Sequence, residues 1–290
     1  MRTARRQPWL GPRRVDRTSP SCRFMRLFVA SIMLVLIASA SAGDWQAQLS
    51  RKPGTFAPLR PLRATYDFGW SGFKAARAEV DFSRTKVGQY QLDVKAASIG
   101  AARAMWRMDS SSTSIVRPKA LLPVELAQTE AYSDETRKTT VVFGPEAVSR
   151  TRETKPADEG SGKTKRFKFT PVHDLHSALL FVRSQPLEQG NAVRLVVYPA
   201  AEAYLADIEV LGRETINVAG RSWSAIKLGL KLQKVNKKLK LEPHKNFKKA
   251  IAWLSDDSDR LLLKIESEVM IGKVWMNLAN YQFSENAAGQ

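Results

Sequence analysis

The chain has 290 residues, a formal net charge of +18 and a single cysteine, Cys22. One cysteine cannot form an intrachain disulfide, so the composition excludes a disulfide-stapled fold and a zinc site built from several cysteines. The excess of lysine and arginine favours acidic partners such as anionic lipid or envelope polymers, and without a nucleic-acid-binding motif we expect no nucleic acid among them.

The N-terminal region predicts a cleaved leader. Arg26 is followed by an apolar run over residues 27–38, which is too short to span a bilayer, and then by small residues up to Ala42. We therefore predict a signal peptide over residues 25–42 that is cleaved after Ala42. The mature protein would be periplasmic and would contain no transmembrane anchor.

Residues 1–24 precede this leader and contain seven arginines without an apolar period. They are either a long positively charged start of the leader or a non-native extension upstream of a true start at Met25 rather than Met1. We favour the extension, because the residues from Met25 already form a complete leader start. Cys22 lies in this region, so the mature chain has no cysteine and no site for a lipid anchor.

The rest of the chain has the pattern of one β-rich domain over residues 62–284, preceded by a flexible N-terminal segment over residues 43–61. Apolar and polar residues alternate in residues 79–83 and 90–95, which is typical of half-buried strands. Further strands are expected at residues 124–131, 136–143, 147–152, 193–198, 203–211, 223–232, 250–254, 261–268 and 273–283. The fold class is therefore mostly β: a large curled antiparallel sheet or open barrel-like domain with one short helix.

That helix is predicted over residues 175–184, and Asp174 is placed to cap its N-terminus. Residues 99–108 are alanine-rich and fit either a second short helix or a bulged strand. His173 and His176 lie three residues apart at the helix start, yet His244 is the only other histidine. A zinc site needs three or four ligands, so we expect no metal and no cofactor.

Two further features of the sequence give little support to a metal site or to catalysis. Residues 256–259 read DDSD, but they lack the spaced ligands, glycine and terminal glutamate of a calcium loop. They predict a hairpin turn, because Asp and Ser side chains bond to their own backbone. No G-x-S-x-G motif is present, so the sequence identifies no catalytic residue, and an enzyme is less expected than a noncatalytic protein.

Two groups of residues are candidates for ligand contact. Aromatic residues lining a concave sheet would bind an apolar ligand; the candidates are Trp70, Phe73, Trp106, Trp223, Trp253 and Trp275. A lysine-rich β-arm would contact an anionic lipid surface; its candidates are Lys234, Lys237, Lys238, Lys240, Lys245, Lys248 and Lys249. The alternatives are a filled aromatic core and a solvated hairpin whose charges keep an edge strand from pairing.

Five segments, taken in order, carry a family resemblance: YDFGWSGFKAARAEVDF, SSSTSIVRPKALLPVEL, HDLHSALLFVRSQPLEQG, VLGRETINVAG and IAWLSDDSDRLLLKIESEVMIGKVWMNL. Together they resemble the domain of unknown function 3108 family of exported bacterial proteins. The resemblance implies a β-rich periplasmic protein without an assigned activity, related in fold to the open half-barrels of lipoprotein carriers. We expect a noncatalytic protein that binds an amphipathic or hydrophobic ligand or an envelope component. The alternatives are a hydrolase acting on envelope polymers and a structural partner in an envelope assembly.

Overall fold

A computed structural model describes residues 44–55, 59–243, 247–269 and 272–284, and residues 44–290 form one compact unit. The predicted leader, its cleavage site and the preceding extension lie outside the described residues. Within the described part of the chain, no helix has the length and apolar character needed to cross a membrane.

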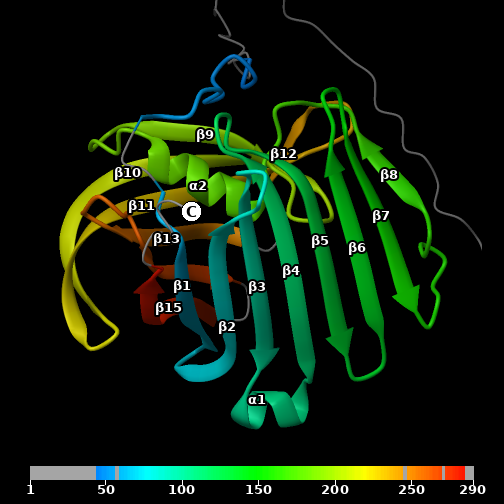
Figure 1. Cartoon of the computed structure of the whole chain (residues 1–290), viewed down its shortest axis with the longest axis horizontal. Coiled ribbons are helices and arrows are strands. Elements are labelled where there is room, and N and C mark those ends of the chain that lie inside the picture. The colour runs from blue at the N-terminus through cyan, green and yellow to red at the C-terminus, as the bar shows by residue number, and fades with distance from the viewer. Residues whose placement is uncertain (1–43, 56–58, 244–246, 270–271, 285–290) are drawn as a thin grey trace, which may run out of the picture. The chain divides into compact units, whose positions relative to one another are not determined.

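The described residues form fifteen strands and two short helices, shown in Figure 1. The strands are β1 (Leu62–Trp70), β2 (Phe73–Arg84), β3 (Tyr90–Ser98), β4 (Met108–Arg117), β5 (Leu122–Tyr132), β6 (Thr136–Phe143), β7 (Val148–Lys155), β8 (Thr164–Phe167), β9 (Ala192–Val197), β10 (Ala203–Val218), β11 (Arg221–Val235), β12 (Leu241–Pro243), β13 (Phe247–Ser255), β14 (Leu262–Val269) and β15 (Gly272–Phe283). The helices are α1 (Gly100–Met105) and α2 (Leu175–Ser184). The mostly β fold class is confirmed, and α2 has the predicted bounds, while α1 adds a second helix.

One antiparallel sheet contains all of these strands. Its order is β8-β7-β6-β5-β4-β3-β2-β1-β15-β14-β13-β11-β10-β9, and β12 pairs with β11 beside this path. The sheet is open, with β8 and β9 as its edges. The first and last strands, β1 and β15, pair with each other in its middle, from Leu62 opposite Phe283 to Trp70 opposite Val274.

The larger hydrophobic core lies on the sheet face that packs against α2, which we call the inner face. Leu180 and Phe181 of α2 are 0% and 1% exposed. They belong to one cluster with Phe82 of β2, Leu228 of β11 and Leu263 of β14. Strands from both halves of the sheet therefore bury their apolar side chains around the same helix.

A second cluster joins the two ends of the sheet. Val148 on β7 and Phe167 on β8 pack with Val196 on β9, Leu205 on β10 and Val235 on β11. The sheet thus curls until its ends meet, and they meet through side chains rather than through a strand pair.

Part of the segment predicted to be flexible is fixed by contacts with the domain. Leu49 is 8% exposed within the second cluster. The backbone N–H of Ser50 donates to the carbonyl of Arg194 at 2.9 Å, and that of Gly54 donates to Ser184 Oγ at 3.0 Å. These tertiary contacts give residues 44–55 a defined path that their composition does not indicate.

Gly69 of β1 lies directly beneath the indole of Trp275. A Cβ atom at position 69 would lie 2.0 Å from Cζ2 of Trp275 and 2.4 Å from the carbonyl oxygen of Phe73. We expect Gly69→Ala to lower the free energy of unfolding by about 1–3 kcal/mol, since the strand and the ring must shift to make room. Urea denaturation measures this cost. A double variant that also carries Trp275→Leu should recover part of it, and an unchanged midpoint for Gly69→Ala would contradict the close packing.

Candidate functional site

One end of the sheet carries a group of exposed large apolar side chains. Trp70 and Phe73 flank the β1–β2 turn and are 46% and 77% exposed, and Met105 and Trp106 at the end of α1 are 85% and 55% exposed. Figure 1 shows this turn and α1 at the same end of the sheet, at the bottom of the view. We call these four residues the aromatic rim. Single exposed apolar residues are ordinary on a protein surface, whereas a cluster indicates a contact surface.

Local geometry brings the rim together. The backbone N–H of Ile99 donates to the carbonyl of Ala75 at 2.9 Å, which fixes the start of α1 against β2. Helix α1 buries none of its residues. The Trp106 ring lies 6.1 Å from that of Tyr132, at the neighbouring β5–β6 turn. The core therefore gives no reason for Met105 and Trp106 to be apolar.

Basic side chains surround the rim. Asp67 pairs with Lys74 at 2.6 Å and with Arg77 at 2.8 Å. Asp109 likewise contacts two arginines, Arg103 at 2.8 Å and Arg107 at 3.5 Å. Each carboxylate is thus shared between two cations, and this leaves an excess of positive charge.

The arginines stabilise the charged form of Asp109, and the hydrogen bond from Arg103 lowers the pKa of its carboxyl group. Lys273, exposed at the start of β15, lies beside the β1–β2 turn, because the Ser71 N–H donates to the Lys273 carbonyl at 2.9 Å, and it stands opposite Glu268 of β14. The rim is therefore apolar at its tip and basic at its base.

The six aromatic candidates do not line one cavity. Trp70, Phe73 and Trp106 gather on the outside in the rim, and the partly buried Trp275 packs beside them over Gly69.

The other two aromatic candidates lie elsewhere in the sheet. Trp223 is 5% exposed, beneath the guanidinium of Arg221 at 3.6 Å. Trp253 is 6% exposed, and its indole N–H donates to Glu214 Oε1 at 2.7 Å.

The lysine candidates lie around the β11–β12 hairpin. Lys234 pairs with Glu202 at 2.6 Å. Lys237, Lys238 and Lys240 are exposed in or beside the turn, and Lys249 is exposed on β13. Lys248 also lies on β13, and Lys245 lies outside the described residues. Figure 1 places β12 at the top of the view and α1 at the bottom, so the hairpin with Lys237, Lys238 and Lys240 is separate from the rim. Lys249 instead shares a cross-strand row with Glu268 and Lys273.

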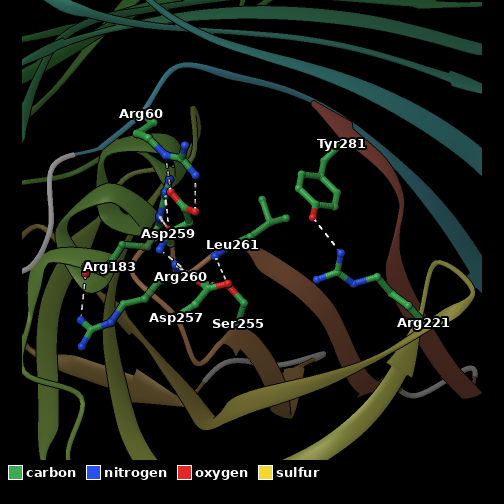
Figure 2. A network of polar contacts seen from close by, with 9 residues as sticks. All are labelled: Arg60, Arg183, Arg221, Ser255, Asp257, Asp259, Arg260, Leu261 and Tyr281. Carbon is green, nitrogen blue, oxygen red and sulfur yellow. Dashed lines mark hydrogen bonds and ion pairs between the residues drawn. The ribbon is translucent and has the colours of Figure 1, made fainter. Parts of the chain in front are cut away.

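The acidic stretch at residues 256–259 forms the β13–β14 turn, as Figure 2 shows. Asp257 Oδ1 accepts the backbone N–H groups of Asp259 and Arg260, each at 3.0 Å, and the Ser255 hydroxyl at 2.7 Å. The Asp259 carboxylate receives Arg60 Nε at 2.8 Å, and the Asp259 carbonyl receives Arg183 Nη2 at 2.6 Å. This network ties the turn to α2, so these carboxylates have structural partners.

Asp174 caps α2 from a fully buried position. Its Oδ1 accepts the Ser177 N–H at 2.7 Å, its own N–H donates to Ser177 Oγ at 3.1 Å, and its Oδ2 accepts the Ser114 hydroxyl. His176 Nε2 lies 3.4 Å from Ser112 Oγ. Both Asp174 oxygens are thus used by other donors than His176. The described residues contain no group of three or more His, Cys, Asp or Glu placed to hold a metal ion.

Sequence reasoning did not identify two grooves on the outer face of the sheet, of which the first is the more polar. One has a volume of about 620 Å³ and crosses β15, β1, β2, β3 and β4, and the other has about 520 Å³ and crosses β2 to β5. Glu79, Lys95 and Ser111 line both grooves. The walls of the grooves are rows of side chains from neighbouring strands, such as Arg63, Asp81 and Asp93. These residues are brought together by the strand register, which the sequence does not give.

Comparison with known proteins gives a family and a fold. The family described as "Protein of unknown function (DUF3108)" matches residues 65–279. A search of curated proteins finds no match. Among solved structures, a β-barrel-like protein of the domain of unknown function DUF1849 from Brucella abortus is similar, with a TM-score of 0.55 and 8% identity over 79% of this chain and 99% of that chain.

Two further structures have lower similarity. A Bacteroides fragilis protein described as exported, with a YmcC-like fold, has a TM-score of 0.33 and 6% identity over 79% of this chain and 99% of its own. A Parabacteroides distasonis protein described as a lipoprotein has a TM-score of 0.32 and 6% identity over 80% of this chain and 100% of its own. The Brucella protein supports the β-barrel-like fold, and none of the three supplies an activity.

Proposed function

The chain belongs to the DUF3108 family of proteins of unknown function, and on that premise we propose that it is an exported, noncatalytic envelope domain that binds an anionic membrane surface through the aromatic rim. The observation that carries this proposal is the rim itself, with four large apolar side chains that are 46% to 85% exposed. Aromatic rings beside basic residues suit the boundary between lipid head groups and acyl chains.

The expected energetics fit reversible binding. Full burial of one large apolar side chain is worth about 1.5–3 kcal/mol, and each lysine or arginine near an anionic surface adds about 1 kcal/mol. The side chains of Lys74 and Arg107 are 46% and 63% exposed beside the rim. Because these charges are in contact with solvent, salt should weaken the electrostatic part of binding.

A surface contact accounts for the aromatic candidates better than an internal apolar pocket does. Trp223 belongs to the larger hydrophobic core, which contains α2, while Phe73 and Trp106 extend away from it. Burying Phe73 and Trp106 requires a partner from outside the domain, and lipid is the partner that the adjacent excess of positive charge favours.

Vesicle flotation tests this proposal with the leaderless chain, residues 43–290, and vesicles of equal parts phosphatidylglycerol and phosphatidylcholine. We expect Phe73→Ser combined with Trp106→Ser to reduce binding at least tenfold, because two of the four apolar side chains of the rim are lost. The matched control is Val87→Ser, since Val87 is 81% exposed at the β2–β3 turn, at the opposite strand ends. This control should bind like the unchanged protein.

Two outcomes would contradict the rim as the contact. The first is undiminished flotation of the double variant. The second is loss of flotation only when Lys237, Lys238 and Lys240 are reversed to glutamate, which would assign the contact to the lysine arm.

A further inference from the structure

Next to the second hydrophobic cluster, the inner face of β5, β6 and β7 becomes polar. Leu126 of β5, Val141 of β6 and Val148 of β7 belong to that cluster. Residues two positions along a strand share a face, so the side chains that follow also lie on the inner face. These residues, which we call the inner polar patch, are Gln128, Glu130, Arg137, Thr139, Arg150, Arg152 and Thr154, and they form cross-strand rows.

Buried polar atoms without partners are concentrated in this patch. The Nε atoms of Arg137, Arg150 and Arg152 and the Oγ1 of Thr154 are buried and have no hydrogen-bond partner among the described residues. Buried polar groups in folded proteins are nearly always satisfied, if not by protein then by water or a ligand. Several unsatisfied donors on one face therefore indicate a missing acceptor.

Arg150 is the least satisfied of these side chains. Arg137 pairs with Glu135 and Arg152 pairs with Asp158, each at the edge of the patch. Arg150 is 8% exposed and makes no hydrogen bond or ion pair with any described residue. Of its guanidinium nitrogens, only Nε is buried without a partner, so the two Nη groups have solvent access and can donate to a bound ion.

The groups around Arg150 are mainly donors. Lys165 stands opposite it on β8, and Thr139 and Arg152 form the next row. Thr139 is 7% exposed, so this row extends into the buried part of the patch. Glu130 is the carboxylate of the patch, and it lies one row further away, where it accepts the Tyr132 hydroxyl at 3.3 Å. From the other end of the sheet, Tyr198 lies within electrostatic range of Arg150 and of Glu202, and Glu202 pairs with Lys234 at 2.6 Å. The cations Arg150, Arg152 and Lys165 therefore still outnumber the unpaired carboxylates near Arg150, which favours an anion.

We propose that Arg150 anchors a binding site for a phosphate group on the inner face of β6 and β7. The planar guanidinium donates two parallel hydrogen bonds to an oxyanion, and Arg152, Thr139 and Lys165 supply further donors. The phosphate is either free or part of a lipid head group. The site lies on the inner face and the aromatic rim lies at the strand ends, so the two proposals stand independently.

Isothermal titration of the leaderless chain at constant ionic strength tests this site with two probes. They are inorganic phosphate and dihexanoyl phosphatidylglycerol below its micelle concentration. We expect saturable binding that Arg150→Gln weakens at least tenfold. The matched control is Arg166→Gln, because Arg166 is exposed on β8 in the alternate register position, opposite Ser149. This control should keep the affinity of the unchanged protein.

The outcomes separate the two sources of phosphate. Binding of both probes supports a site for free phosphate, and binding of the lipid analogue alone supports a head-group site. If neither probe binds, or if Arg150→Gln binds as tightly as Arg166→Gln, the proposal is overturned. Should Arg150→Gln fail to fold, Arg150→Lys keeps the charge without the planar fork and is expected to bind several-fold more weakly; unchanged affinity in that variant would also overturn the proposal.

Discussion

Between pH 6.5 and pH 4 the free energy of unfolding is expected to fall by about 3 kcal/mol, because His173 is buried as a neutral imidazole. Burial lowers the pKa of this histidine from 6.5 to about 4. In that interval the unfolded chain binds a proton that the folded chain does not. Stability is therefore complete above pH 6.5 and is lost as the pH falls towards 4.

The surroundings of His173 explain the shift. The residue is 2% exposed, and its ring stands edge-on to Phe181 with 5.1 Å between centroids. Within the described part of the chain its Nδ1 has no hydrogen-bond partner, so a proton added there would be buried without an acceptor. Burial also lowers the pKa of His176, which acts in the same direction.

Urea denaturation at a series of pH values measures this effect. His173→Gln keeps an N–H near the position of the imidazole Nε2 but does not titrate, so most of the pH dependence between 6.5 and 4 should disappear. His176→Gln is the matched comparison and should remove a different part of the dependence. Equal slopes for the unchanged protein and His173→Gln would refute the assignment to this residue.

Replacing Asp174 with alanine is expected to lower the free energy of unfolding by about 3 kcal/mol or more. The carboxylate is 0% exposed and accepts both the Ser177 N–H and the Ser114 hydroxyl. Alanine would leave these two buried donors without an acceptor, at about 1–3 kcal/mol each, and would remove the helix cap.

Asp174→Asn separates the cap from the charge. Its amide oxygen keeps the bond from the Ser177 N–H, so its cost should be clearly below that of alanine. Asp158→Ala, which removes an exposed partner of Arg152, is the matched control and should change stability by less than about 1 kcal/mol. An equal cost for alanine and asparagine at position 174 would contradict the capping explanation.

Features encoded by near neighbours in the chain were predictable from the sequence. Asp174 precedes a helical apolar period, and the structure has a helix from Leu175 to Ser184 with a complete capping box. The DDSD stretch predicts a hairpin turn, and the Asp257 carboxylate bonds to backbone N–H groups two and three residues ahead. In both cases the residues that determine the geometry lie within three positions of one another in the sequence.

Features that depend on what lies opposite a strand were not predictable. Alternation assigns a side chain to one of two faces, but it does not say whether that face is covered. In β7, Arg150 and Arg152 alternate with Thr151 and Glu153, so both faces are polar and the period gives no contrast. Trp106 is similar, because only the position of the short helix before it shows that its ring stays about half exposed.

The pairing of β1 with β15 has a consequence for biosynthesis. The ribosome releases β15 after every other described strand, and until then β1 lacks one of its two neighbours in the middle of the sheet. Before β15 is available, the two halves of the sheet can form separately, but they cannot be joined. Contacts between residues this distant in sequence also slow the step that joins them. The chain therefore stays short of its native state throughout translation, which would suit the export proposed above, since a chain must still be unfolded when it enters a secretion channel.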